Sequence, residues 1–229
     1  MFKKKSFFAI LMAAVLVVPV MFAACSKKNN KKEEKATAAK YDTSKIEQTI
    51  ATMKETGYLF TYKTTANGES IEMTYGAKGN IFYHKIANEE MYVDLSSDTE
   101  GVLYTYNSAT ESWTKTVIRY EDVSKDENVE KYDQAFEQLK GCMTVYDNPA
   151  IKNTPAVTKD VVIAGRECEN FTVSISMGGE SMSYSFAIDK ETGICMKYSV
   201  TVSGEDLDMN ISIECTQFST NWVPQLPEV

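Results

Sequence analysis

The chain has a single histidine, His84, among its 229 residues. A catalytic triad with histidine would have to use this residue, and no Gly-x-Ser-x-Gly nucleophile elbow accompanies it. Zinc-type metal sites need His or Cys in closely spaced pairs, which the five scattered cysteines do not provide. We therefore expect His84 to pack on or within a strand, and we expect no enzymatic activity, no metal and no cofactor.

Basic residues are scarce in the main part of the chain. Residues 41–229 carry 15 basic and 30 acidic side chains. Binding to nucleic acid depends on neutralising phosphates with Lys and Arg, so this composition excludes a nucleic-acid partner. Residues 25–40 are different, with six Lys against two Glu. This short stretch is either a solvated linker or a segment attracted to anionic lipid head groups.

The first 24 residues have the pattern of a secretory signal. Three lysines precede an uncharged run from Ser6 to Ala24, which ends in small residues before a cysteine. The alternative interpretation is an uncleaved transmembrane helix, although Pro19 interrupts the apolar run. The pattern indicates an exported protein in which residues 1–24 are a removable signal peptide.

The segment Phe22-Ala23-Ala24-Cys25 resembles the lipobox of bacterial lipoproteins, although that family usually has Leu where this chain has Phe22. The resemblance implies cleavage before Cys25, with a diacylglyceryl thioether and an acylated amine on that residue. More than one acyl chain suffices for stable anchoring. Residues 25–43 would then form a basic tether from the lipidated Cys25, and the protein would be anchored to the cell membrane or the outer membrane.

The residues from 44 onwards alternate between helical and strand patterns. Ser44 and Glu47 have the spacing of a capping box, and Ile46, Ile50 and Met53 follow at helical spacing. A second helix is expected over residues 126–140. Period-two alternation predicts strands near 58–63, 71–75, 81–87, 91–95, 102–106, 113–118, 161–168, 171–177, 182–188, 194–202 and 207–215.

Each clear strand has one apolar and one polar face, which is typical of an antiparallel sheet with one face exposed to water. The sequence therefore predicts a mainly β (α+β) fold in a single domain over residues 44–229. We expect a curved antiparallel sheet of about eleven strands, with the helices over its concave face.

Four features of this domain resemble the LolA/LolB-like superfamily, which includes periplasmic lipoprotein carriers and lipid-binding lipoproteins. They are the helix before the first strands, the stretch Gly101 to Tyr106 followed by Trp113, the stretch Phe186 to Tyr198, and the end from Phe218 to Pro227. The resemblance implies a half-barrel that binds a lipid or lipoprotein. Polar residues typical of the carriers' cavity mouth have no clear counterpart here, so lipoprotein transport is not implied.

Large or flexible side chains gather on the presumed concave face, where they would suit an adaptable apolar pocket. The candidate lining residues are Phe60, Tyr62, Met73, Met182, Tyr184, Phe186, Met196, Tyr198 and Met209. The alternative is that these residues fill a close-packed core, and that the protein is a non-enzymatic interaction or envelope-sensor module with a protein partner.

Four cysteines remain besides Cys25, and an exported chain permits disulfides. Alternation places Cys168 and Cys195 on the same polar face. A strand lies between them, and such a separation is too long for a bridge without a bulge or bend. A Cys168–Cys195 disulfide and unpaired thiols are both left open.

Overall fold

The computed structural model describes residues 44–121, 123–133, 149–152, 154, 156–177, 180–204 and 208–229. The predicted signal peptide (1–24), Cys25 and the tether (25–43) lie outside these ranges, as does the end of the predicted helix 126–140. None of the helices in the described ranges is long and apolar enough to cross a membrane.

Eleven strands and three helical segments follow one another along the described chain. In order they are α2 (Ser44–Thr56), β1 (Tyr58–Ala66), β2 (Glu69–Lys78), β3 (Ile81–Ile86), β4 (Glu89–Asp94), β5 (Glu100–Asn107), β6 (Ser112–Arg119), α3 (Lys125–Tyr132), α5 (Pro149–Lys152), β7 (Val157–Ile163), β8 (Arg166–Met177), β9 (Glu180–Asp189), β10 (Cys195–Ser203) and β11 (Asp208–Ser219).

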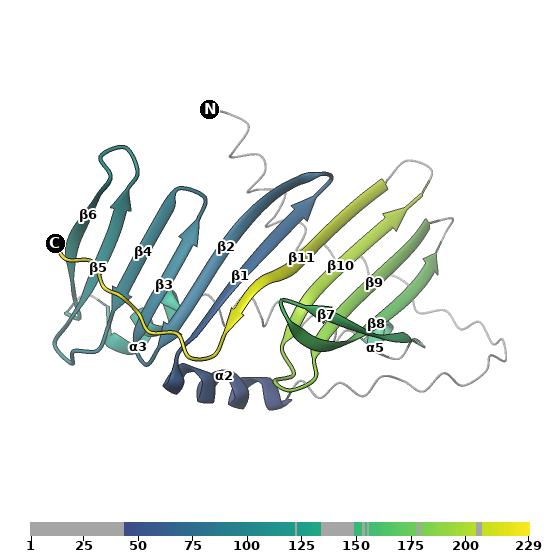
Figure 1. The fold of residues 1–229 in the computed structure, drawn as a ribbon, viewed down its shortest axis with the longest axis horizontal. Helices are drawn as coiled ribbons and strands as arrows, with labels where there is room; N and C mark the ends of the chain where they lie inside the picture. Colours follow the sequence, from purple (N-terminus) through teal and green to yellow (C-terminus); the bar gives the residue numbers. More distant parts are fainter. Residues whose placement is uncertain are drawn as a thin grey trace.

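All eleven strands belong to one sheet, in the order β6-β5-β4-β3-β2-β1-β11-β10-β9-β8-β7. Strands β1–β6 form a first meander and β7–β11 a second (Figure 1). The two meanders are joined where β1 pairs with β11, with Phe60 opposite Phe218 and Thr64 opposite Ile213. Every pairing is antiparallel. The predicted mainly β fold with an eleven-stranded antiparallel sheet is confirmed.

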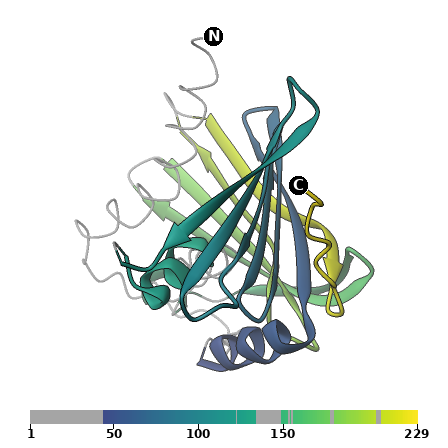
Figure 2. The same ribbon diagram turned by 90° about the vertical axis from the view of Figure 1, so that its left-hand side faces the viewer.

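The core lies on one face of this curved sheet, which we call the inner face. Along β1 the side chains of Tyr58, Phe60 and Tyr62 are buried on this face, and the intervening side chains are more exposed. Helix α2 contributes Ile46 and Ile50 to the same core. Seen from the side, α3 lies on the inner side of the first meander, and the C-terminal segment lies on the opposite side (Figure 2).

The junction between α2 and β1 requires glycine. Gly57 has a φ of +94° and its amide donates to the Met53 carbonyl at 2.9 Å, which ends the helix. The Gly57 carbonyl accepts from the Trp222 amide at 3.2 Å, and a Cβ on Gly57 would lie 2.0 Å from the Trp222 carbonyl oxygen. The C-terminal segment is thereby fixed against the outer side of the sheet.

Helix α2 begins at Ser44, as the sequence predicts. The side chains of Ser44 and Glu47 are outside the described part of the structure, so their capping box stays a prediction. A complete capping box is present instead at the start of α3, between Ser124 and Glu127.

Candidate functional site

A small pocket lies on the inner face of the first meander, next to α3. It is lined by Phe82 and His84 from β3, Met91 and Val93 from β4, and Tyr132 from α3. Its volume of about 10 Å³ is close to the minimum that holds one water molecule. A larger ligand would therefore have to displace Tyr132 and, with it, the end of α3.

The register of β3 and β4 brings the four strand residues of the pocket together. Phe82 lies directly opposite Val93, and His84 lies opposite Met91. Residues two apart on a strand point to the same face, so these two pairs form one continuous patch. The wall of the pocket is thus mostly apolar, with His84 as its polar member.

The surroundings of His84 favour its uncharged form. Burial lowers the pKa of its imidazole from the ordinary value of 6.5. The ring stacks on Tyr75, with centroids 4.8 Å apart and an interplanar angle of 14°. Its Nε2 atom is buried and has no hydrogen-bond partner in the described part of the structure. This placement agrees with the expectation that His84 packs within a strand, and it also makes His84 part of a site.

Helix α3 is held firmly at its beginning. The Ser124 hydroxyl accepts from the Glu127 amide at 3.3 Å, and the Glu127 carboxylate accepts from the Ser124 amide at 3.1 Å. The buried Asn128 side chain donates to the carbonyls of Val123 and Ser124 at 3.1 and 2.9 Å. These contacts fix the first turn of the helix independently of the pocket.

The end of α3 is held by an ion pair with α2. Lys54 Nζ donates to Asp133 Oδ2 at 2.6 Å, and Asp133 directly follows Tyr132 in the pocket. The two side chains are 21% and 16% exposed. The same ammonium lies 5.2 Å from the ring centroid of Phe82, a wall residue of the pocket. A charged pair therefore stands at the rim of an apolar pocket.

Tyr58 adds a polar atom beside this ion pair. The side chain is fully buried, and its hydroxyl lies beside the Asp133 carboxylate. Burial, followed by the nearby Asp133 carboxylate, raises the pKa of Tyr58. The rim thus holds one cation, one anion and an uncharged hydroxyl.

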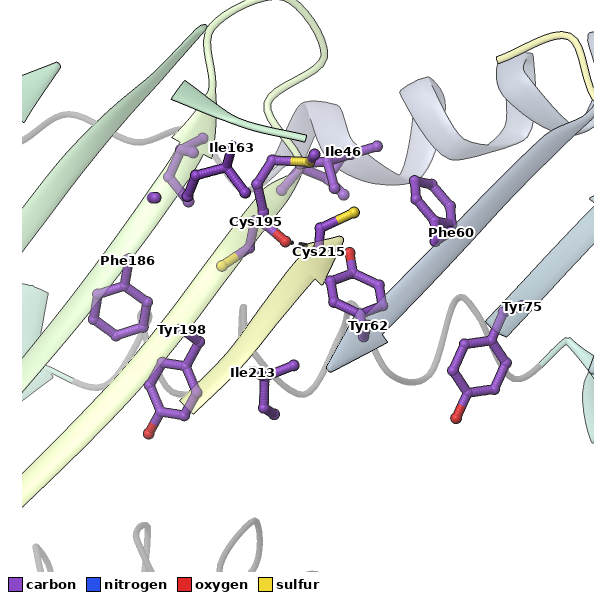
Figure 3. Packing of buried hydrophobic residues seen from close by; sticks show 14 of the residues in the cluster. Ile46, Phe60, Tyr62, Tyr75, Ile163, Phe186, Cys195, Tyr198, Ile213 and Cys215 are labelled. Carbon is purple, nitrogen blue, oxygen red and sulfur yellow. Dashed lines mark hydrogen bonds between the residues drawn. The ribbon is translucent and has the colours of Figure 1, made fainter. Parts of the chain in front are cut away.

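The nine residues predicted to line a pocket share the inner face, as expected, but they lie mainly in the second meander and at the junction of the two. Eight of them are buried, and Met209 is partly exposed. Within this group the rings of Phe186 and Tyr198 are 5.3 Å apart, and the Tyr62 hydroxyl donates to the Cys195 carbonyl at 3.3 Å (Figure 3). In the described structure they pack as a core, and none of them lines the pocket described above.

Sequence reasoning missed all five residues of that pocket as a site. The alternation in residues 81–87 and 91–95 places Phe82, His84, Met91 and Val93 on one face and could have suggested the strand part of it. Tyr132 could not be found this way, because no local pattern shows which strands a helix covers.

The Cys168–Cys195 disulfide considered from the sequence is not formed. The Cys168 thiol donates to the Arg166 carbonyl at 3.5 Å, and the Cys195 thiol donates to the Lys197 carbonyl at 3.2 Å. Strand β9 lies between them, since Cys168 is opposite Asp189 and Cys195 is opposite Ile188. An irregularity in β10 after Cys195 also changes the alternation that placed Cys195 on the polar face.

No known protein family and no curated protein matches the sequence. Among solved structures the chain is similar to MucB in complex with MucA(peri), with 12% identity and a TM-score of 0.35 over 82% of this chain and 58% of that chain. It is similar to the Pseudomonas aeruginosa MucA/MucB complex, with 13% identity and a TM-score of 0.33 over 80% of this chain and 58% of that chain. It is also similar to a putative outer membrane lipoprotein-sorting protein domain from Vibrio parahaemolyticus, with 8% identity and a TM-score of 0.22 over 78% of this chain and 93% of that chain. The chain thus corresponds to little more than half the length of the MucB chains.

Proposed function

We propose that this chain is an exported protein of the cell envelope, anchored to a membrane by lipid at Cys25, which binds an acyl chain on the inner face of its first meander. The ligand is a lipid or a lipoprotein acyl group. The observation that carries the proposal is the incomplete cover of the apolar inner face in β3–β6.

The two halves of the sheet differ in this respect. In the second meander the inner-face residues Val173, Tyr184 and Val200 are almost fully buried. In the first meander Phe82 and Val93 are buried, whereas the inner-face residues Ile86, Met91, Leu103 and Ile118 are only partly buried, as is Tyr132 on α3. The partly buried inner-face residues of the second meander include Ile175 and Met209. An incompletely covered apolar face beside a small pocket is a site that an apolar ligand can complete.

An acyl chain would enter by displacing the Tyr132 ring and would then contact Phe82, Met91 and Val93. Methionine suits this role because its flexible thioether adapts to the shape of a ligand. His84 would meet the ligand as a neutral group and would not place a charge in the apolar site.

The test uses the mature chain, residues 25–229, with Cys25 replaced by Ser, which we call the Cys25→Ser protein. It is titrated with a fluorescent acyl probe, offered as the free acid and as its uncharged methyl ester. Met91→Lys places a charge in the pocket and should abolish binding of both probes. The matched control is Met209→Lys, because Met209 is also a partly buried methionine on the inner face but belongs to the second meander. Loss of binding in Met209→Lys alone would show that the acyl probe binds at the nine residues predicted from the sequence. No binding of either probe by the parent would refute acyl binding.

A second function, recognition of a protein partner, is favoured by a row of aromatic side chains on the outer face. Trp222, Tyr83 and Tyr92 follow one another with ring centroids 5.9 and 4.6 Å apart, and Trp113 lies 5.6 Å from Tyr92 and 5.2 Å from Tyr106. Partly exposed Tyr and Trp are typical of protein interfaces.

A photo-crosslinking residue in place of Trp113 should capture one specific protein in cells, and the same residue in place of Thr201 on β10 should not. Equal products at both positions would refute this second function.

A further inference from the structure

We infer that the ligand of this pocket is an anionic amphiphile, whose headgroup replaces the Asp133 carboxylate at Lys54 and thereby releases the end of α3. This inference rests on the proposed acyl-binding function and specifies its ligand class and the way in which the site opens.

Lys54 places a cation beside the wall of the pocket. Lys54 Nζ is 5.2 Å from the ring centroid of Phe82, and Phe82 is part of the pocket wall. An acyl chain lying against Phe82 brings its first polar group within reach of this ammonium. The headgroup of a bound amphiphile therefore meets a positive charge at the rim of the site.

Beside Phe82, Lys54 already pairs with the carboxylate of Asp133. Its ion pair with Asp133 has an N–O distance of 2.6 Å. A fatty-acid carboxylate or a lipid phosphate offers the same negatively charged oxygen atoms. The buried Tyr58 hydroxyl, which lies beside the Asp133 carboxylate, supplies a second donor for a group that takes the place of that carboxylate.

Replacement of Asp133 by the ligand headgroup at Lys54 would also open the pocket. Tyr132 fills one side of the pocket, and the next residue is Asp133, whose amide caps the helix by donating to the Val129 carbonyl at 3.0 Å. As long as Asp133 is paired with Lys54, Tyr132 is held in the pocket. Exchange of Asp133 for the ligand headgroup removes that restraint at the moment the acyl chain needs the space.

Headgroup charge should therefore decide affinity. A neutral headgroup cannot replace Asp133, so its acyl chain must displace Tyr132 while the ion pair stays intact. A cationic headgroup is repelled by Lys54. We expect the Cys25→Ser protein to bind dodecanoate more tightly than dodecanol by roughly twofold to fivefold, the scale of one partly exposed ion pair. Dodecylammonium should bind most weakly.

Two variants separate the roles of the pair. Lys54→Met should bring the ratio of dodecanoate to dodecanol affinity close to one, and Lys54→Arg should preserve the preference for the acid. Asp133→Asn should bind dodecanoate more tightly than the parent, because the competing carboxylate is gone. The matched control is Lys85→Met, which removes the lysine of another partly exposed pair, Lys85–Glu90 at 2.9 Å, and should leave the ratio unchanged.

Hydrogen exchange in α3 tests the same inference structurally. Dodecanoate should speed hydrogen exchange in residues 125–133 of the parent, and it should have little effect on that exchange in Asp133→Asn. Equal affinities for acid and alcohol in the parent, with no effect of Lys54→Met on them, would overturn this inference and leave acyl binding standing. Failure of all three amphiphiles to bind would instead refute the proposed function itself.

Discussion

Met196 and Met209 occupy the same inner face but differ in burial. Met196 on β10 is fully buried, whereas Met209 on β11 is partly exposed. Truncating a packed methionine leaves a cavity, so we expect Met196→Ala to lower the free energy of unfolding by roughly 2–5 kcal/mol. Met209→Ala should lower it by about 1 kcal/mol, since fewer contacts are lost. Denaturant unfolding measures both values. Similar small losses in the two variants would show that Met196 borders open space, as the pocket predicted from sequence requires.

Because the imidazole of His84 is buried, the stability of the protein should fall as the pH falls. Its pKa is lowered in the folded state from 6.5, so the unfolded chain binds the proton more readily. The contribution of His84 to stability is complete above pH 6.5 and is lost as the pH falls from 6.5 through the folded pKa.

Denaturant unfolding from about pH 7.5 to about pH 5.5 tests this prediction, because few other side chains titrate there. The parent should lose stability over this range, and His84→Phe should lose less. The same slope in both proteins would contradict the assignment of a neutral His84 in the pocket.

At the scale of single elements, α3 is the part whose stability should control access to the pocket. Ser124 is its N-cap, and loss of this cap should cost the helix about 1 kcal/mol. If the helix must move for a ligand to enter, Ser124→Ala should raise the affinity for an acyl probe while lowering the free energy of unfolding. Isothermal titration and denaturant unfolding check the two effects. Ser174→Ala, an exposed serine on β8, serves as the control and should change neither. Weaker acyl binding in Ser124→Ala would show that α3 must stay in place to hold the ligand.

The strands were the most predictable elements. Phe171, Val173 and Ile175 alternate with polar residues, and this period alone gives the strand and the face it buries. The pairing of β1 with β11 could not be derived in the same way, because the pattern of a strand specifies its face and not its partner. The irregularity after Cys195 could not be predicted either, because the residue types around it do not differ from those of a regular strand.

The candidate site was less predictable than the sheet. It depends on contacts between residues remote in sequence, such as Lys54 with Asp133, which no local pattern announces. The sequence did place flexible and aromatic side chains on the inner face. It could not show that those near Tyr198 are enclosed and those near Met91 are only partly covered, because that depends on where α3 packs.

For the whole molecule, the proposed lipid anchor at Cys25 would determine where the site operates. Under the proposed anchoring, residues 25–43 would set the distance between the domain and the bilayer. A flexible chain of nineteen residues spans roughly 25 Å. Cys25→Ser should remove the acylated thiol, so we expect no incorporation of labelled fatty acid and accumulation of the uncleaved precursor. Labelling in growing cells followed by gel electrophoresis measures both. Undiminished labelling of the variant would contradict the anchor assignment.

The pairing of β1 with β11 also has a consequence for the order of folding. The first strand of the sheet has no partner on one side until the last strand has been delivered, because Leu59 pairs with Ser219 from the other end of the domain. Contacts so distant along the chain raise the contact order, which slows folding. A chain crossing a membrane from its N-terminus therefore cannot complete this sheet until nearly all of it has emerged. Under the proposed export, this delay in completing the sheet would lengthen the time during which the chain can pass through a translocation channel.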